Sequence, residues 1–374
     1  MKKLPGINLY NQDRLDDNNF VEIFVARHDT LDLLLNFLRR QAKGVAPEHQ
    51  ILIGARGMGK SSMLRRLAIA VKADGQLRDK FIPLRFREEQ YNVLSIDAFW
   101  RNCGEALAEW CEAEKHDDEA ARLDREIETA AWRDSGAAGE GFRTACARIG
   151  ARPLLLVDNF DIIIDALSEN ECWGLRRALQ APGGPIVIGA ATRPLEQAGN
   201  RDAPFYEFFH PLVLDPLTQR ELFECLAKLA NMRAEAGAAV RAILAQEPER
   251  VATLYTLTGG NPRILALIYQ LLERAESETV FADLEALLDQ VTPFYKARIE
   301  EFHSTQQRAI IDAIALNWDP ITSGVLAETT GVEVTTISSQ ISRFKKLGII
   351  EEVPTSGARS GYQLGERFFN IWYL

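Results

Sequence analysis

The chain has 374 residues, of which 47% are apolar and 26% are charged, and its net charge is −10. This length is enough for two or three domains, and this composition is typical of globular proteins rather than of disordered, collagen-like or fibrous ones. The acidic balance disfavours a protein that neutralises nucleic acid over its whole surface, although it leaves room for a local basic patch.

The sequence shows neither a membrane anchor nor a cysteine framework. No apolar core of a signal peptide follows the first lysines, and every later apolar stretch is shorter than the roughly 18 residues that a membrane span needs. The five cysteines are widely spaced and form no CxxC pair, so neither disulfides nor a zinc site is indicated. We therefore expect a cytoplasmic protein that does not contact membranes.

Five short runs rich in Ile, Leu and Val predict strands that are buried on both faces of a sheet. They are Gln50–Gly54, Phe81–Phe86, Pro153–Asp158, Pro185–Ala190 and Leu212–Leu214. Apolar residues at helical spacing follow the first two runs. Strands that alternate with amphipathic helices predict an α/β fold with a parallel five-stranded sheet.

The first strand leads into a glycine-rich segment, 54–61, that fits GxxxxGK[ST] at every fixed position. Between a buried strand and a helix, such a loop turns backbone amides toward the β- and γ-phosphates of a nucleotide, and the helix N-terminus adds a partial positive charge. Lys60 supplies a full charge and Ser61 a hydroxyl for magnesium. The alternative is a glycine turn that matches by chance. The expected nucleotide contacts here are Gly54, Ala55, Arg56, Gly57, Met58, Gly59, Lys60, Ser61 and Ser62.

The segment Glu112–Phe142 is dense in Ala, Glu, Asp and Arg and ends in the glycine-rich stretch 135–141. This composition predicts a solvated helical excursion that ends in a flexible joint.

Polar residues end two of the later strands. Asp158 is a lone carboxylate at the end of Pro153–Asp158, where magnesium sits in phosphate-loop proteins. Aspartate at a strand end is also common turn chemistry. Thr192 and Arg193 follow the next strand, and the planar guanidinium of Arg193 suits a γ-phosphate oxygen, the alternative being an ordinary surface arginine.

The rest of the chain is predicted to be mostly helical. A capping box at Thr218–Glu221 starts a helical region to about residue 301, which the turn Thr258–Arg263 interrupts. Three helices and a β-hairpin then predict a winged helix. The predicted helices and strands of that part are Gln306–Leu316, Thr322–Thr330, Val334–Leu347, Ile349–Val353 and Tyr362–Leu364. The expected domains are a nucleotide-binding domain at 1–215, a helical lid at 216–301 and a winged helix at 302–374.

With these motifs in order, the chain resembles the STAND branch of the AAA+-like P-loop ATPases, close to prokaryotic ATPases related to origin-recognition proteins. The resemblance rests on the phosphate loop, the strand ending in Asp158, Thr192-Arg193 in the sensor-1 place and Gly260-Asn-Pro262-Arg263 in the GxP place of the lid. It implies ATP or ADP and Mg²⁺ as cofactors.

The same resemblance implies further nucleotide contacts. Pro262 would pack on the nucleotide and Arg263 would act as a lid sensor, the alternative being an Asn-Pro pair that only caps a helix. Val25 and Arg27 look like the adenine-contacting segment of the family, which usually has glycine where this chain has Ala26.

One departure from many AAA+ enzymes bears on the rate of hydrolysis. They carry a glutamate directly after the magnesium aspartate to orient the attacking water, and this chain has Asn159. An amide cannot accept the proton. We therefore predict slow ATP hydrolysis with Asp161 as the nearby base, together with Lys60, Asp158 and Arg193 in the catalytic set.

Three functions are compatible with this sequence. The leading one is an ATP-binding switch in bacterial defence or signalling, whose output is self-association or a protein partner. The second is a DNA-binding AAA+ ATPase of the replication-initiation or transposition type, and the third is a scaffold that never hydrolyses ATP. From Ser304 to the end there are six Lys and Arg against seven Asp and Glu, a net charge of −1 that disfavours DNA. The intact Lys60, Ser61 and Asp158 disfavour the third function.

The last residues, 368–374, are apolar and aromatic. We expect either that they pack on the winged helix or that the chain continues into a longer protein.

Overall fold

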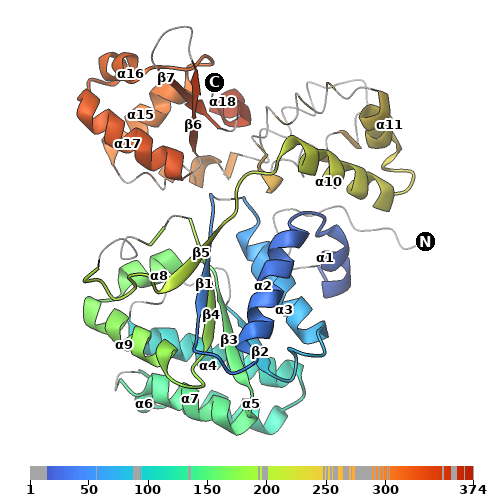
Figure 1. Ribbon diagram of the computed structural model, residues 1–374, viewed down its shortest axis with the longest axis vertical. Helices are drawn as coiled ribbons and strands as arrows, with labels where there is room; N and C mark the ends of the chain where they lie inside the picture. The colour runs from blue at the N-terminus through green and yellow to red at the C-terminus, as the bar shows by residue number, and fades with distance from the viewer. Residues whose placement is uncertain are drawn as a thin grey trace. The chain divides into compact units, whose positions relative to one another are not determined.

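The computed structural model describes residues 15–55, 57–86, 95–133, 136–192, 201–246, 304–347, 349–354, 360–365 and 367–373, with single residues and short stretches between these ranges. The chain divides into two compact units (Figure 1). The sheet unit consists of Arg27–Ile53 and Lys60–Leu214, and the C-terminal unit consists of Met1–Ala26, Gly54–Gly59 and Asp215–Leu374.

A parallel five-stranded sheet forms the centre of the sheet unit (Figure 1), which confirms the predicted α/β fold class. Its strand order is β2-β3-β4-β1-β5, so β4 lies between β1 and β3. The strands are β1 (His49–Ile53), β2 (Phe81–Arg85), β3 (Arg152–Val157), β4 (Ile186–Ala191) and β5 (Phe209–Val213).

Helices cover both faces of this sheet. Leu155 and Val157 of β3 belong to a core with side chains from α4, α8 and α9, whereas Leu154 and Leu156 alternate with them and face the side on which α3 packs. Strands that are buried on both faces read as continuous apolar runs, which is why the sequence shows them. The covering helices are α2 (His28–Gln41), α3 (Lys60–Ala73), α4 (Ile96–Ala113), α8 (Phe160–Ala166) and α9 (Glu169–Gln180).

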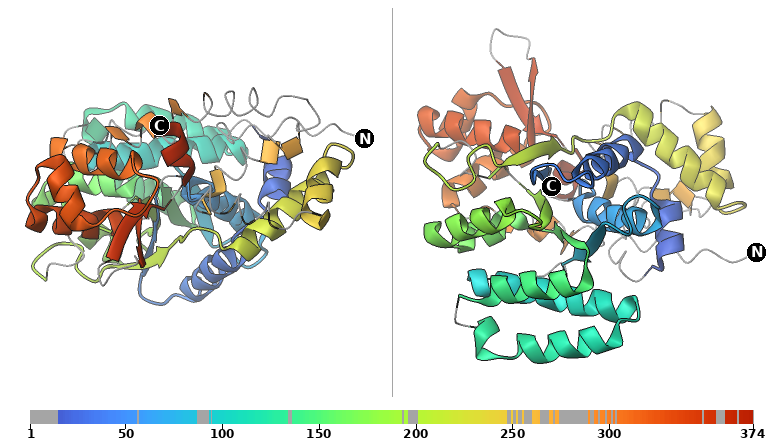
Figure 2. Two further views of the ribbon diagram at one scale, coloured as in Figure 1. Left: turned by 90° about the horizontal axis from the view of Figure 1, so that it is seen from above. Right: turned by 60° about the horizontal axis from the view of Figure 1, so that its bottom comes forward.

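A helical layer lies against α4 (Figure 2) and corrects the prediction of a solvated excursion. It contains α5 (Asp117–Ile127), α6 (Ala130–Arg133) and α7 (Ala138–Ile149). Leu123 and Trp132 are buried in the same core as the sheet. The Trp132 ring occupies space left by two glycines, since a Cβ on Gly104 or Gly141 would lie 2.6 or 2.7 Å from it. The many charged residues on the outer face make the segment look fully solvated in the sequence.

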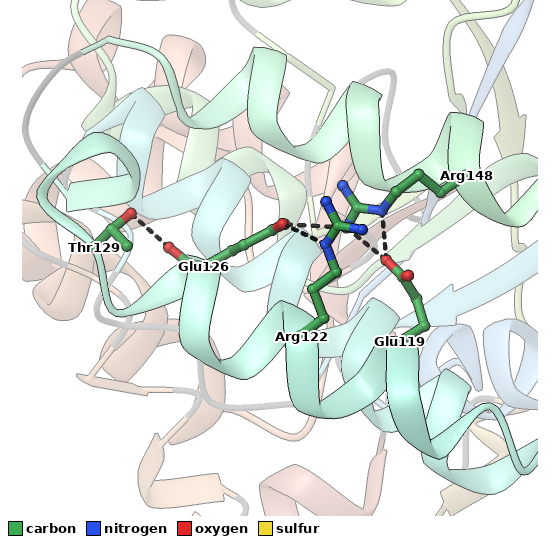
Figure 3. Close-up of polar contacts among 5 residues, drawn as sticks. All are labelled: Glu119, Arg122, Glu126, Thr129 and Arg148. Carbon is green, nitrogen blue, oxygen red and sulfur yellow. Dashed lines mark hydrogen bonds and ion pairs between the residues drawn. The ribbon is translucent and has the colours of Figure 1, made fainter.

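One arginine joins the helices of this layer on their outer side (Figure 3). The Nε of Arg148 on α7 donates to Glu119 at 2.7 Å, and its Nη2 donates to Glu126 at 3.0 Å, both on α5. Arg122 also donates to Glu126, at 2.9 Å. Burial alone would raise the pKa of Glu126, but the hydrogen bonds from Arg122 and Arg148 outweigh it and lower that pKa. The ion pairs therefore hold α7 on α5.

The C-terminal unit is largely helical in its described parts. The predicted capping box is present at the start of α10: Thr218 Oγ1 accepts from the Glu221 backbone at 3.3 Å, and the Glu221 carboxylate accepts from the Thr218 backbone at 2.7 Å. The strands β6 and β7 form an antiparallel pair after three helices, in the predicted order. The elements of this unit are α1 (Asp17–Ile23), α10 (Gln219–Met232), α11 (Ala238–Gln246), α15 (Thr305–Ala315), α16 (Ser323–Thr330), α17 (Val334–Lys346), β6 (Ile350–Pro354), β7 (Ser360–Leu364) and α18 (Arg367–Tyr373).

The aromatic last segment forms α18 and packs on α15 and β7. Phe369 is buried and stacks on Tyr295 with ring centroids 4.7 Å apart. Asn370 Nδ2 donates to the Ala315 carbonyl at 2.9 Å, and the Tyr373 hydroxyl lies 2.5 Å from Asp312. The segment thus docks on the elements predicted to form the winged helix.

Two further properties concern the whole described chain. None of the described helices has the length and apolar character needed to cross a membrane. All five cysteines are free thiols, and all five are buried.

His49 at the start of β1 is a buried imidazole, 1% exposed. Its Nδ1 accepts a hydrogen bond from the Val187 backbone at 3.1 Å, and its ring stacks on Phe208 at 4.8 Å. Burial, with repulsion from Arg152 and His210, lowers the pKa of His49 from 6.5 to about 3. The folded state therefore keeps this ring neutral at a pH where the unfolded chain is protonated.

We expect the sheet unit to lose stability as the pH falls from 6.5 toward 3, because only the unfolded state binds the proton of His49 in that window. At pH 5 the loss from this group is about 2 kcal/mol. Urea unfolding at pH 7 and pH 5 measures it. His49→Gln should reduce the pH dependence by that amount, whereas His210→Gln, at an exposed position, removes only the smallest of the three causes and should retain most of it. Equal pH dependence in the wild type and His49→Gln would contradict this assignment.

Candidate functional site

Residues 54, 55 and 57–59 lie in a loop between β1 and α3, as the sequence predicts. Gly57 and Gly59 have φ angles of 84° and 86°, in the left-handed region that glycine adopts without strain. The Met58 backbone donates to the Ala55 carbonyl at 3.3 Å, which closes the turn. Arg56 lies outside the described residues. This is a phosphate-loop conformation that side-chain-bearing residues would not adopt at both glycine positions.

The helix α3 begins at Lys60, whose side chain is only 7% exposed. Ser61 and Ser62 follow in its first turn. The Ser61 hydroxyl donates directly to the Asp158 carboxylate, which comes immediately after β3. The other Asp158 oxygen accepts from the Asn159 backbone at 2.9 Å. The two residues predicted as magnesium ligands are therefore in contact.

These two residues fit a magnesium ion. Magnesium takes oxygen ligands and is usually bound by one or two protein oxygens together with water and nucleotide phosphates. A serine hydroxyl and a carboxylate that already touch each other provide that donor set within the sheet unit. Bound there, the ion would neutralise phosphate charge, and Ser61 and Asp158 would be the residues that hold it.

The strand order explains why the residues that follow β1, β3 and β4 lie at one edge of the sheet. β4 pairs with β1 so that Ala191 lies opposite Ile53, and with β3 so that Gly189 lies opposite Val157. Thr192 follows Ala191 directly. The carboxyl end of β4 therefore lies between β1, which leads into the phosphate loop, and β3, which Asp158 follows.

Asn159 and Asp161 follow Asp158, and Asp161 lies in the first turn of α8. Asn159 has a φ of 49°, a left-handed conformation that Asn tolerates better than most residues. Asp161 is 3% exposed, and its Oδ2 accepts from the Thr192 hydroxyl at 2.8 Å and from the Thr192 backbone at 3.1 Å. Arg193, the next residue, lies outside the described residues. The sequence did not predict this pairing.

The turn at Gly260–Arg263 and the phosphate loop lie against each other within the C-terminal unit. Gly260 has a φ of 73°, and its carbonyl accepts from the Leu217 backbone at 2.9 Å. The Asn261 side chain is 1% exposed and accepts from the Arg263 backbone at 3.0 Å, which caps the helical turn of Pro262 and Arg263. A Cβ on Gly57 would lie 2.6 Å from the Asn261 Oδ1. Asn261 therefore lies against the loop, although the sequence drew attention only to its neighbours.

The N-terminal segment divides between the two units. Val25 and Ala26 are partly buried against the core of the C-terminal unit, where Lys228 donates to the Val25 carbonyl at 3.4 Å. Arg27 begins the sheet unit and caps α2 with a φ of 62°. The left-handed residue of this segment is thus Arg27. It is not Ala26, the position where the family that this chain resembles usually has glycine.

Residues 23–188 match the family model described as the AAA ATPase domain. Together with the sheet order and the phosphate loop, this match supports an AAA+-like P-loop ATPase domain in this part of the chain.

Two solved structures share the fold over nearly the whole chain. A Walker-type ATPase of Pyrococcus abyssi has a TM-score of 0.61 at 14% identity and covers 94% of this chain and 96% of its own. The ORC1 protein of Aeropyrum pernix, solved in complex with DNA, has a TM-score of 0.50 at 16% identity and covers 96% of this chain and 94% of its own. At these identities the likeness is one of fold. No curated protein sequence matches the chain.

Proposed function

We propose that the protein is an ATP-binding switch of the STAND type, which hydrolyses ATP slowly and controls self-association or a protein partner through its nucleotide state. The observation that carries this proposal is the contact between the Ser61 hydroxyl and the Asp158 carboxylate. Because this pair fits magnesium and Lys60 starts the same helix, the chain keeps the groups that bind a nucleoside triphosphate.

Each residue has a role in this proposal. Lys60 binds the β- and γ-phosphates, Ser61 and Asp158 bind Mg²⁺, and Arg193 contacts the γ-phosphate. In the same proposal the remaining contacts come from the lid and the N-terminal segment. Pro262 and Arg263 read the nucleotide from the lid, and Val25 and Arg27 contact the adenine.

The proposed parts are a nucleotide-binding domain at 1–215, a lid at 216–301 and a winged helix at 302–374. A nucleotide that converts a mostly closed population into a mostly open one must favour the open state by about 5 kcal/mol. A lid and a winged helix that respond to the nucleotide would supply this difference. We place the switch in the cytoplasm, in bacterial defence or signalling, and the five buried free thiols support a reducing compartment.

We expect slow ATP turnover, because Asn159 cannot accept the proton of the attacking water, and with Asp158 assigned to Mg²⁺ the nearest remaining carboxylate in the sequence is Asp161. Turnover of the wild type, Asn159→Glu and Asp161→Asn tests this expectation. Asn159→Glu should accelerate hydrolysis while costing roughly 1 kcal/mol of stability, since glutamate must adopt the left-handed φ of 49°. A fast wild type that neither substitution changes would overturn the prediction.

The switch itself is tested by nucleotide occupancy of the purified protein and by its mass in ATP and in ADP. We expect one mass with ATP and another with ADP, and we expect Lys60→Ala to show a single mass in both. Identical mass profiles in all three conditions would refute nucleotide-controlled assembly.

DNA binding is the second candidate, and the fold shared with an ORC1 protein solved on DNA favours it. The exposed face of α17 carries Thr335, Ser338, Arg343 and Lys345. Lys345, however, pairs with Glu352 of β6, so its charge is partly neutralised. A gel shift with random duplex at low and high salt decides: steep loss of affinity with salt supports DNA, and no binding at low salt excludes it.

A further inference from the structure

The start of α8 packs tightly against β4. Phe160 is fully buried, and a Cβ on Gly189 of β4 would lie 3.1 Å from it, so the absence of a side chain at Gly189 lets α8 approach the strand. The left-handed Asn159 provides the turn from β3 into α8. This packing brings Asp161, in the first turn of α8, to the end of β4.

The two carboxylate oxygens of Asp161 differ in their hydrogen bonds. Its Oδ2 accepts both the hydroxyl and the backbone N–H of Thr192. Its Oδ1 is buried and has no hydrogen-bond partner among the described residues. A buried carboxylate is costly unless donors compensate for it, and Thr192 supplies both of the donors found here. The carboxylate therefore fixes the backbone and the side chain of Thr192 together.

The pair of Asp161 and Thr192 lies at the edge of the sheet where the γ-phosphate of ATP, which ADP lacks, is expected to bind. Ala191 lies opposite Ile53, the last residue of β1 before the phosphate loop, and β3 on the other side leads to Asp158. In a phosphate-loop site the γ-phosphate and its magnesium occupy the space between those two strand ends. Thr192 stands at the end of the strand between them.

We propose that Asp161 is a positioning residue: through its Oδ2 it holds Thr192 at the γ-phosphate end of β4, so that the affinity for ATP relative to ADP depends on Asp161. The inference rests on the proposed function, because it assumes that nucleotide binds this domain. It assigns Asp161 an equilibrium role that is separate from any role of its Oδ1 as a base.

The two roles predict different results. A residue that acts only as a base changes turnover and leaves the affinities for ATP and ADP as they were. A residue that only stabilises the fold weakens both nucleotides together. Replacing a residue that positions Thr192 weakens the binding of ATP relative to that of ADP, and the replacement has no further effect once Thr192 itself has been changed.

The experiment measures the affinities of ATP and ADP for Asp161→Asn, Thr192→Val and the double variant, in the presence of Mg²⁺. Each single variant should lower the ratio of ATP to ADP affinity by roughly tenfold, because Asp161→Asn replaces the charged acceptor of both Thr192 donors with a weaker neutral one, and Thr192→Val removes the hydroxyl donor. The double variant should lower it no further. Thr192→Ser keeps both donors and should retain the wild-type ratio.

Asp165→Asn is the matched control, because Asp165 is an exposed carboxylate on the same helix. It should leave the ratio unchanged. A wild-type ratio in Asp161→Asn, or additive losses in the double variant, would overturn the inference even if turnover falls. A wild type that binds neither ATP nor ADP would instead refute the proposed function, and the inference with it.

Discussion

Replacing Lys60 with Ala should lower ATP affinity by about 100-fold and leave the fold intact. In the proposed site, the substitution would remove the hydrogen bonds of a buried ammonium group to phosphate, which contribute about 3 kcal/mol. Without nucleotide the same ammonium group lies in the first turn of α3, where the helix dipole repels it. Lys60 also has contacts within the folded chain, so the nucleotide-free variant is the baseline that measures what the substitution costs the fold itself.

Thermal unfolding with and without Mg-ATP measures both effects. Nucleotide that binds only the folded state stabilises the wild type by about 2.7 kcal/mol at 100 times its dissociation constant, and at that concentration Lys60→Ala should lose most of this gain. Lys72→Ala is the matched control, since Lys72 lies on the same helix and pairs with Glu114 at 2.9 Å on the surface. A stabilisation by ATP that persists in Lys60→Ala would contradict the assigned site.

Much of the sheet unit could be predicted because its strands are buried on both faces. The interior strands β3 and β4 are nearly continuous apolar runs, and their observed bounds differ from the predicted ones by one residue at each end. β5 was predicted as three residues and has five, because it is an edge strand that includes His210 and Pro211, which an apolar run does not contain. The layer α5–α7 was missed as a packed element because its outer face is highly charged while Leu123 and Trp132 are buried.

The candidate site was predictable where function fixes the spacing along the chain. The loop 54–61 and Asp158 follow from such spacing, and the Ser61–Asp158 contact agrees with both. The pair of Asp161 and Thr192 could not be predicted, because it depends on β4 lying beside β3, and strand order is not written in the apolar pattern. The proximity of Asn261 to Gly57 likewise joins residues about 200 positions apart.

That proximity predicts different outcomes for two glycines of one loop. Gly57→Ala must place a side chain at a φ of 84° and a methyl group 2.6 Å from the Asn261 Oδ1. The Asn261 side chain is buried and holds the Arg263 backbone, so it cannot easily move away. Gly59→Ala meets only the backbone cost at a φ of 86°, since nothing lies within 4 Å of its Cβ. That backbone cost is about 1–2 kcal/mol, and overpacking adds about 1–3 kcal/mol at Gly57 alone.

Gly57→Ala should therefore destabilise the C-terminal unit more than Gly59→Ala does, and it should abolish ATP binding because the loop amides shift. The double variant Gly57→Ala with Asn261→Ala tests the cause. Asn261→Ala alone loses a helix cap, a cost of about 1 kcal/mol, but it makes room for the new methyl group. The double variant should then lose at least about 1 kcal/mol less unfolding free energy than the sum of the two single variants. If the losses in urea unfolding are additive, a clash with the Asn261 side chain is not the reason that Gly57→Ala is destabilising, and glycine is required at position 57 for its backbone conformation alone.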